Sequence, residues 1–158
     1  LFSYYNAPHP QEVHAPLSLP KSAPQKTSLL SYGHTHLPHR GYLHSRSLLT
    51  LPEFLHLADE IVIARGDLGN AMPLWELPRC QKQLSAACRA AGVPFMVVTQ
   101  MLDSMCSRAV PTRAEVSDIY NAVADGASSV MLTGETAAGQ YPVEAMEYLV
   151  RTARTALE

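Results

Sequence analysis

The sequence predicts an α/β fold in which three strand–helix units follow one another behind an irregular N-terminal segment. Three short apolar runs begin at Ile61, Phe95 and Val130, 34 and then 35 residues apart. Continuous apolar runs are typical of strands buried on both faces of a parallel sheet. The spacing leaves room for one helix after each strand, and it fits either a doubly wound sheet or part of a barrel. A closed eight-unit barrel needs about 250 residues, so we expect 158 residues to form at most a part of one.

Helices are predicted between the strands from apolar residues at helical spacing. Gly92 and Pro94 end the first helix, Thr112 and Glu115 form a capping box at the start of the second, and Pro142 suits the first position of the third. The residues expected to face inward are Leu77, Cys80, Leu84, Cys88 and Ala91 in the first helix, Val116, Ile119, Tyr120 and Val123 in the second, and Val143, Met146, Val150, Ala153 and Leu157 in the third.

The N-terminal part differs from the rest in composition. All seven histidines and seven of the twelve prolines precede Ala58, and the net charge is +2 before that residue and −4 after it. Frequent prolines favour extended backbone, and no helical or strand period is sustained from Leu1 to Arg46. We therefore expect residues 1–47 to be irregular or disordered and residues 48–158 to form the folded domain. The residues expected to line a first short helix are Leu48, Leu51, Leu55 and Leu57.

The composition argues against a nucleic-acid-binding protein and against a membrane protein. Apolar residues make up 47% of the chain and charged residues 16%, with a net charge of −2. This is a globular balance, and it lacks the basic footprint of a nucleic-acid-binding protein. No apolar run approaches the roughly 20 residues that span a bilayer. On one helix, Cys80 and Cys88 would lie too far apart for a disulfide. We therefore expect a cytoplasmic protein with neither nucleic acid nor membrane as a partner.

Residues with chemical function follow the first predicted strand. The carboxyl ends of parallel strands carry the chemistry of most α/β enzymes. Arg65, Gly66 and Asp67 come directly after the strand, and glycine allows backbone amides to approach a ligand. Asp67 could bind Mg²⁺ or cap an ordinary turn. Arg65 could bind a phosphate or carboxylate group, or a neighbouring acid.

Polar residues also follow the second and third strands. Thr99 and Gln100 could hydrogen-bond an anionic substrate, although a buried threonine with satisfied hydrogen bonds would give the same pattern. Thr133, Gly134 and Glu135 form a polar loop after the third strand, in which Glu135 could equally be solvated or salt-bridged. All of these residues are expected at one edge of the sheet.

Four ordered motifs closely resemble pyruvate kinase in sequence and spacing. They are Ala64–Gly69, Thr99–Met105, Pro111–Glu115 and Leu132–Ala137, within a resemblance that covers about Leu51 to Glu158. The family transfers a phosphoryl group from phosphoenolpyruvate to ADP, giving pyruvate and ATP in glycolysis. Its catalytic domain is a (β/α)₈ barrel, so the resemblance implies a partial (β/α)₈ TIM barrel made of the last three βα units.

The resemblance implies roles for the first loop and for the cofactors. Asp67 would be a ligand of the Mg²⁺ that bridges substrate and protein. Backbone amides around Ala64, Arg65 and Gly66 would hold the substrate carboxylate at the start of a short helix. The family also uses K⁺, whose ligands are not in this chain.

The resemblance implies roles for the other two loops as well. Thr99 would be catalytic, with its hydroxyl bonded to the substrate near the enolate that must be protonated. The loop with Thr133 and Glu135 would lie near the same pocket. The helix that starts at Thr112 packs at a subunit contact in the family's usual tetramer, so a homo-oligomer is expected of the parent enzyme.

One departure from the family argues against activity of this chain alone. The family carries a Lys-Ile-Glu motif about two dozen residues before the metal-binding aspartate, and ungapped alignment places Gly41-Tyr42-Leu43 there. The lysine stabilises the enolate, and the glutamate is a second metal ligand. We therefore expect an inactive pyruvate kinase fragment. The alternatives are a non-catalytic fragment that binds a full-length subunit and a frameshifted product without function, with residues 1–47 foreign to the enzyme.

Overall fold

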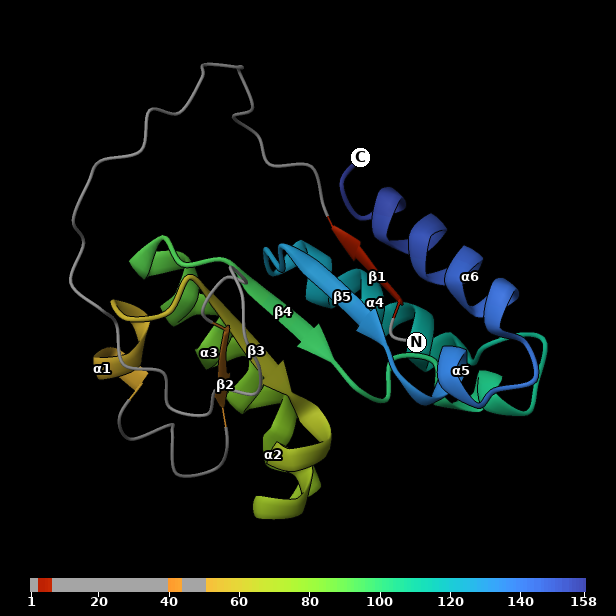
Figure 1. Cartoon of the computed structure of the whole chain (residues 1–158), viewed down its shortest axis with the longest axis horizontal. Helices are drawn as coiled ribbons and strands as arrows, with labels where there is room; N and C mark the ends of the chain where they lie inside the picture. Colours follow the sequence, from red (N-terminus) through yellow and green to blue (C-terminus); the bar gives the residue numbers. More distant parts are fainter. Residues whose placement is uncertain (1–2, 7–39, 44–50) are drawn as a thin grey trace, which may run out of the picture.

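A computed structural model describes residues 3–6, 40–43 and 51–158. Its sheet is built around three parallel strands, β3 (Glu60–Ala64), β4 (Phe95–Val98) and β5 (Ser129–Leu132), with β4 in the middle. Figure 1 shows the three arrows running in the same direction. The prediction of three parallel strands is confirmed, and two of them begin one residue earlier than the apolar runs.

The described part of the N-terminal segment adds a strand at each edge of this sheet, giving the order β1-β5-β4-β3-β2. Strand β1 (Ser3–Asn6) pairs antiparallel with β5, and β2 (Arg40–Leu43) pairs parallel with β3. The prediction that residues 1–47 are irregular is therefore wrong at these two strands. Edge pairing uses backbone N–H and C=O groups, so it requires no side-chain period in the sequence. Residues 1–2, 7–39 and 44–50 lie outside the described part.

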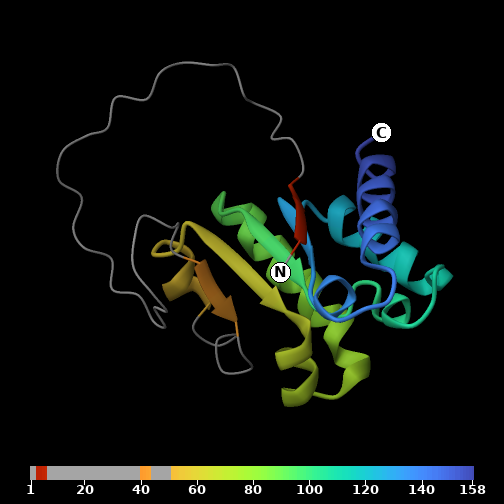
Figure 2. The same ribbon diagram turned by 45° about the vertical axis from the view of Figure 1, so that its right-hand side comes forward.

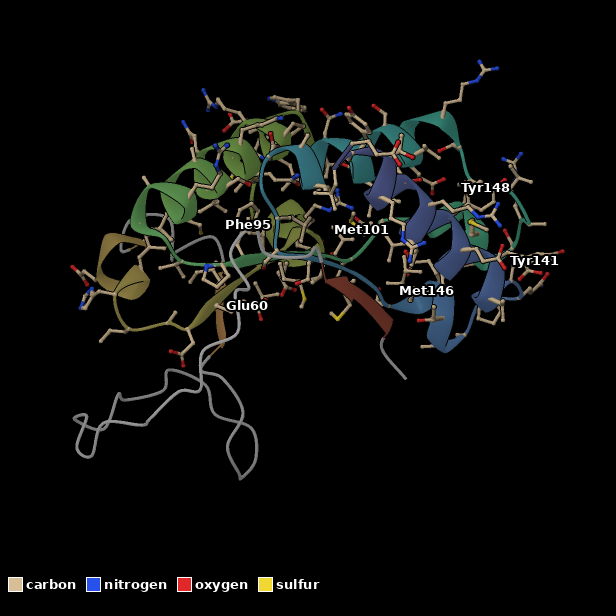
Figure 3. The ribbon with its side chains drawn as sticks, turned by 90° about the horizontal axis from the view of Figure 1, so that it is seen from above. Glu60, Phe95, Met101, Tyr141, Met146 and Tyr148 are labelled. Atoms are coloured by element: carbon tan, nitrogen blue, oxygen red, sulfur yellow. The ribbon has the colours of Figure 1, made fainter. Side chains whose placement is uncertain are left out.

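Three long helices cover one face of the sheet: α3 (Leu77–Ala91), α4 (Arg113–Ala124) and α6 (Pro142–Thr155). In Figure 3 they lie above the strands, and Phe95 lies between β4 and this helical layer. Alternate strand residues such as Ile61 and Val97 enter that core, whereas Val62 and Met96 form a second buried cluster on the opposite face. Burial on both faces explains the continuous apolar runs.

Short helices occupy the connections. The chain passes through α1 (Leu51–Leu55) before β3, α2 (Arg65–Ala71) and the 3₁₀ turn η2 (Leu74–Glu76) after it, η3 (Asp103–Cys106) after β4, and α5 (Gly134–Ala137) after β5. Leu51 of α1 is buried, but Leu57 follows the end of α1 and is exposed, contrary to the predicted helix face. Leu48 lies outside the described residues. No helix within the described ranges is long and apolar enough to span a membrane.

The predicted helix ends are confirmed. Helix α3 ends at Gly92, which adopts the left-handed conformation with φ of +68°. At the start of α4, the Glu115 amide donates to Thr112 Oγ1 at 3.3 Å, and the Thr112 amide donates to Glu115 Oε2 at 2.7 Å. This is the reciprocal capping box that the sequence predicted.

The predicted inward faces are correct for most of α3 and correct in part for α6, where Ala153 is buried and Met146 packs against the core. Cys80, Leu84 and Cys88 are buried as expected, whereas Ala91 and, in α4, Tyr120 are exposed. The expected Val143 in α6 is exposed, and Leu157 lies beyond the end of α6 and is exposed as well. The buried residues of α6 are Ala145, Leu149, Thr152 and the expected Ala153. Helix α6 carries apolar residues on two neighbouring stripes, so their period alone does not select one. Ala145 and Leu149 are the buried apolar residues that the predicted face left out.

Candidate active site

The predicted site residues lie at the carboxyl ends of the three parallel strands. Helix α2 follows β3, the turn at residues 99–102 follows β4, and α5 follows β5. Figures 1 and 2 show α2 and α5 at the end of the sheet to which the strand arrows point. The structure therefore brings the three loops together at one edge, as the sequence predicted.

Gly66 and Thr99 are in direct contact across this edge. The Gly66 amide, in the first turn of α2, donates a hydrogen bond to Thr99 Oγ1 at 2.8 Å. A Cβ atom at residue 66 would lie 3.4 Å from the same oxygen, so glycine allows this close approach. Because a hydroxyl group has one proton to donate, accepting from Gly66 leaves the Thr99 O–H group available to an acceptor.

The Arg65 side chain is buried and bound within the protein. Its guanidinium donates to the carbonyl oxygens of Thr99, at 2.8 and 3.1 Å, and of Gln100, at 2.7 Å. Its third nitrogen pairs with the carboxylate of Asp118 in α4. Of the two alternatives for Arg65, the structure therefore supports the neighbouring acid for the side chain. Thr99 and Gln100 have φ angles of +69° and +54°, which are uncommon for residues with a side chain.

Glu135 is 1% exposed and joins two of the loops. Its Oε1 accepts from the Leu102 amide at 3.0 Å, and its Oε2 accepts from the Thr133 amide at 2.8 Å. The sequence predicted a solvated or salt-bridged carboxylate as the alternative to a site near the substrate. The observed partners are backbone amides, one of them 33 residues away, which no local sequence pattern indicates.

Glu115 has a second partner that sequence reasoning missed. Besides capping α4, its carboxylate accepts from the Ser104 amide at 2.8 Å and from the Ser104 hydroxyl at 2.6 Å. Burial acts to raise the pKa of Glu115, but the hydrogen bonds from Ser104 and Thr112 outweigh burial and hold the pKa below its ordinary value. The loop after β4 is therefore attached to α2 by Arg65, to α5 by Glu135 and to α4 by Glu115.

Asp67 lies exposed in the first turn of α2, beside Gly66. Among the residues that the structure describes, no three His, Cys, Asp or Glu side chains are grouped to hold a metal ion. Mg²⁺ often binds through one or two carboxylates, with the remaining ligands from water and substrate oxygens. Asp67 fits that pattern as a single protein ligand. Its role as a metal ligand stays a prediction.

The pairing of β2 with β3 shows where the residues that replace the Lys-Ile-Glu motif lie. Gly41, Tyr42 and Leu43 pair with Ile61, Val62 and Ile63, so they occupy the strand next to β3. That is the position from which the resemblance expects the lysine and the second carboxylate. The sequence places neither a lysine nor a carboxylate side chain at residues 41–43.

Comparison with known proteins identifies the family. The family model for the pyruvate kinase barrel domain matches residues 44–146. Among curated relatives, the pyruvate kinase of Agrobacterium vitis is 50% identical over 101 residues, covering 64% of this chain and 21% of the relative. The pyruvate kinase of Schizosaccharomyces pombe is 53% identical over 102 residues, covering 65% and 20%.

A solved structure agrees with the sequence relatives. The crystal structure of a pyruvate kinase from Cryptosporidium parvum is 37% identical, with a TM-score of 0.74 over 75% of this chain and 24% of that chain. The described fold is thus an α/β domain of the kind found in a phosphoryl-transferring barrel. The chain belongs to the pyruvate kinase family, through its barrel domain. It spans about a fifth of the length of the curated relatives it matches.

Proposed function

We propose that this chain carries part of a pyruvate kinase active site, the part that faces the metal and the enolate. The reaction is phosphoryl transfer from phosphoenolpyruvate to ADP in glycolysis, giving pyruvate and ATP. The observation that carries the proposal is the 2.8 Å contact of the Gly66 amide with Thr99 Oγ1, beside Asp67. It brings a hydroxyl donor and a carboxylate to one edge of the sheet, in a chain that is 50% identical over 101 residues to the pyruvate kinase of Agrobacterium vitis.

Each group has a separate role in this proposal. Asp67 would hold Mg²⁺, and the ion would supply positive charge that stabilises the transferring phosphoryl group. Backbone amides at Ala64, Arg65 and Gly66 bind the substrate carboxylate, which shares the Gly66 amide with Thr99. The Thr99 hydroxyl donates to the enolate oxygen. Thr133 and Glu135 shape the neighbouring loop.

We propose further that the chain alone does not turn over substrate. Removing one preorganised group that stabilises a developing anion commonly costs about 10²–10³ in rate. Residues 41–43 supply neither the lysine nor the second carboxylate of the family motif. Potassium binding, a cytoplasmic location and assembly into a homo-oligomer belong to the parent enzyme in this proposal, and the ligands of K⁺ lie outside this chain.

The test separates binding from turnover. The whole chain is titrated with Mn²⁺, as a spectroscopic substitute for Mg²⁺, in the presence of phosphoenolpyruvate, and formation of pyruvate with ADP is assayed in parallel. We expect binding without turnover. Asp67→Ala should abolish metal binding, whereas Asp103→Ala, which removes another exposed acid after a neighbouring strand, should leave it unchanged. Equal metal binding by the Asp67→Ala variant would refute the ligand assignment, and turnover by the wild-type chain would refute the expected inactivity.

A further inference from the structure

We propose that Arg65 is a positioning residue that sets the place of the Thr99 hydroxyl. Its guanidinium, held by Asp118, keeps the backbone of residues 99–100 in the left-handed conformation that puts this hydroxyl against the Gly66 amide. The expected effect of Arg65 on substrate binding rests on the proposed function, because that function requires Thr99 to face the substrate. The expected effect of Arg65 on the backbone conformation of Thr99 does not rest on it.

The backbone at this turn requires an external support. Two consecutive residues with side chains, Thr99 and Gln100, have φ of +69° and +54°. Such conformations are sparsely populated, and they persist where surrounding contacts determine them. Thr99 is β-branched, which makes a positive φ more costly still. Something must therefore hold this turn against relaxation to an extended or helical backbone.

The guanidinium has the right shape for that task. Its Nε and one terminal nitrogen converge on the Thr99 carbonyl, and the same terminal nitrogen also reaches the Gln100 carbonyl. In the present conformation of the turn, the two carbonyls approach the same side of the planar guanidinium. Lysine would retain the charge but, as a single point donor, could not hold this arrangement. Asp118 fixes the guanidinium from α4 and neutralises its charge in a buried place.

The other anchors of the loop act at different residues. Glu135 binds the amide of Leu102, and Glu115 binds the amide and hydroxyl of Ser104. The carbonyls of Thr99 and Gln100 are bound by Arg65. Loss of Arg65 should therefore release the first part of the loop and leave residues 102–104 attached.

The chemical consequence concerns the position of one hydrogen-bond donor. The Gly66 amide binds the Thr99 oxygen and fixes its place, and the hydroxyl proton remains available to a ligand. If the turn relaxes, the oxygen leaves the Gly66 amide and the donor is no longer held in place. Arg65 thus determines where this donor lies.

The test follows the backbone of Thr99 by NMR in the isotope-labelled, full-length chain. A residue with positive φ gives an intense nuclear Overhauser effect between its own amide and Hα protons, and we expect this signal at Thr99 and Gln100 in the wild type. Arg65→Lys should lose the signal at Thr99. The control is Lys82→Ala, which breaks a more exposed ion pair with Asp125 away from the site and should keep the signal.

A rescue experiment distinguishes positioning from a general stabilising role. Gln100→Gly relieves the strain at the second left-handed residue without touching the Thr99 hydroxyl. In the Arg65→Lys background it should restore much of the Thr99 signal, an effect that loss of an ordinary ion pair would not produce. If Arg65→Lys fails to fold, Asp118→Asn, which weakens the support of the guanidinium, should reduce the Thr99 signal below that of Lys82→Ala. An unchanged signal in the decisive variant, or the absence of rescue, would overturn the proposal.

A binding measurement separates this inference from the proposed function. The wild-type chain should bind phosphoenolpyruvate with Mg²⁺, and Arg65→Lys should bind it about 10- to 100-fold more weakly, the effect of losing one hydrogen bond to a charged group. If the wild type does not bind, the proposed function fails, and the NMR signals still decide the role of Arg65. Wild-type binding with unweakened binding by Arg65→Lys would overturn the positioning role.

Discussion

Glu115 should contribute most to stability near neutral pH, and less as its carboxylate is protonated. The perturbation is Glu115→Ala. It removes two part-buried hydrogen bonds from Ser104, at 2.8 and 2.6 Å, and the exposed reciprocal half of the capping box at Thr112. A hydrogen bond to a charged group contributes about 1.5–3 kcal/mol, and a helix cap about 1 kcal/mol. Since these bonds share one carboxylate, we expect a total loss of about 2–3 kcal/mol.

The dependence on pH follows from the lowered pKa of Glu115. A carboxyl group with a lower pKa in the folded state stabilises the fold fully above its unfolded pKa, about 4.5 here, and loses this effect as the pH falls through the folded pKa. The free energy of unfolding of wild type and variant should therefore differ most at pH 6–7, as estimated from the titration range of glutamate. The difference should narrow below pH 4.5.

The assay is urea unfolding followed by circular dichroism at several pH values. The control is Glu147→Ala, which removes the same charge from an exposed ion pair with Arg151 in α6. That pair should contribute less than about 0.5 kcal/mol. A loss for Glu115→Ala that equals the control, or that stays constant down to pH 3, would show that the contacts with Ser104 do not stabilise the fold as argued.

Two further predictions concern packing. Burial raises the pKa of the Cys88 thiol to about 11, so a thiol reagent at neutral pH should modify Cys88 only after the chain is unfolded in urea, and rapid modification in native buffer would contradict its burial in α3. Gly139→Ala should destabilise the fold by about 1–3 kcal/mol, because the new Cβ would lie 2.3 Å from the carbonyl oxygen of Glu135. Gly134→Ala is the matched control: its Cβ would meet only Cys106 Sγ, at 3.8 Å, and the change should be neutral or stabilising.

The central sheet and the helix ends were predictable from the sequence because local patterns determine them. A strand buried on both faces requires a continuous apolar run, as at Ile61, and the capping box with its N-cap at Thr112 marks the start of α4. Strands β1 and β2 were missed since their pairing is made by backbone groups. The face of α6 was predicted correctly at Ala153 and wrongly at Val143, because Val143 and the buried Ala145 are both apolar and helix spacing does not choose between them.

The residues of the candidate site were predictable from the sequence, but the partners that each side chain binds were not. The motifs placed Arg65, Thr99 and Glu135 at one edge, and the structure agrees. Their contacts between loops join residues 33 to 53 apart in the sequence, as in the pairing of Arg65 with Asp118. No local sequence pattern indicates such contacts. A charged residue in a motif is therefore interpreted as a ligand for substrate even where its side chain binds the protein's own backbone.

The residues that place Thr99 and the residues expected to supply charge for the reaction belong to different parts of the sequence. The groups that shape the loop after β4, from Arg65 to Glu135, all lie within residues 44–146, the range that matches the family model. Among the residues that the structure describes, the side chains that hold Thr99 and its loop therefore come from within this range. The lysine and second carboxylate of the proposed reaction would come from the strand before β3, where this chain has Gly41, Tyr42 and Leu43. Under the proposed function, the chain keeps the architecture that places the hydroxyl donor and lacks the charges that the transition state requires. A positioned donor without those charges is expected to bind the substrate and leave it unchanged.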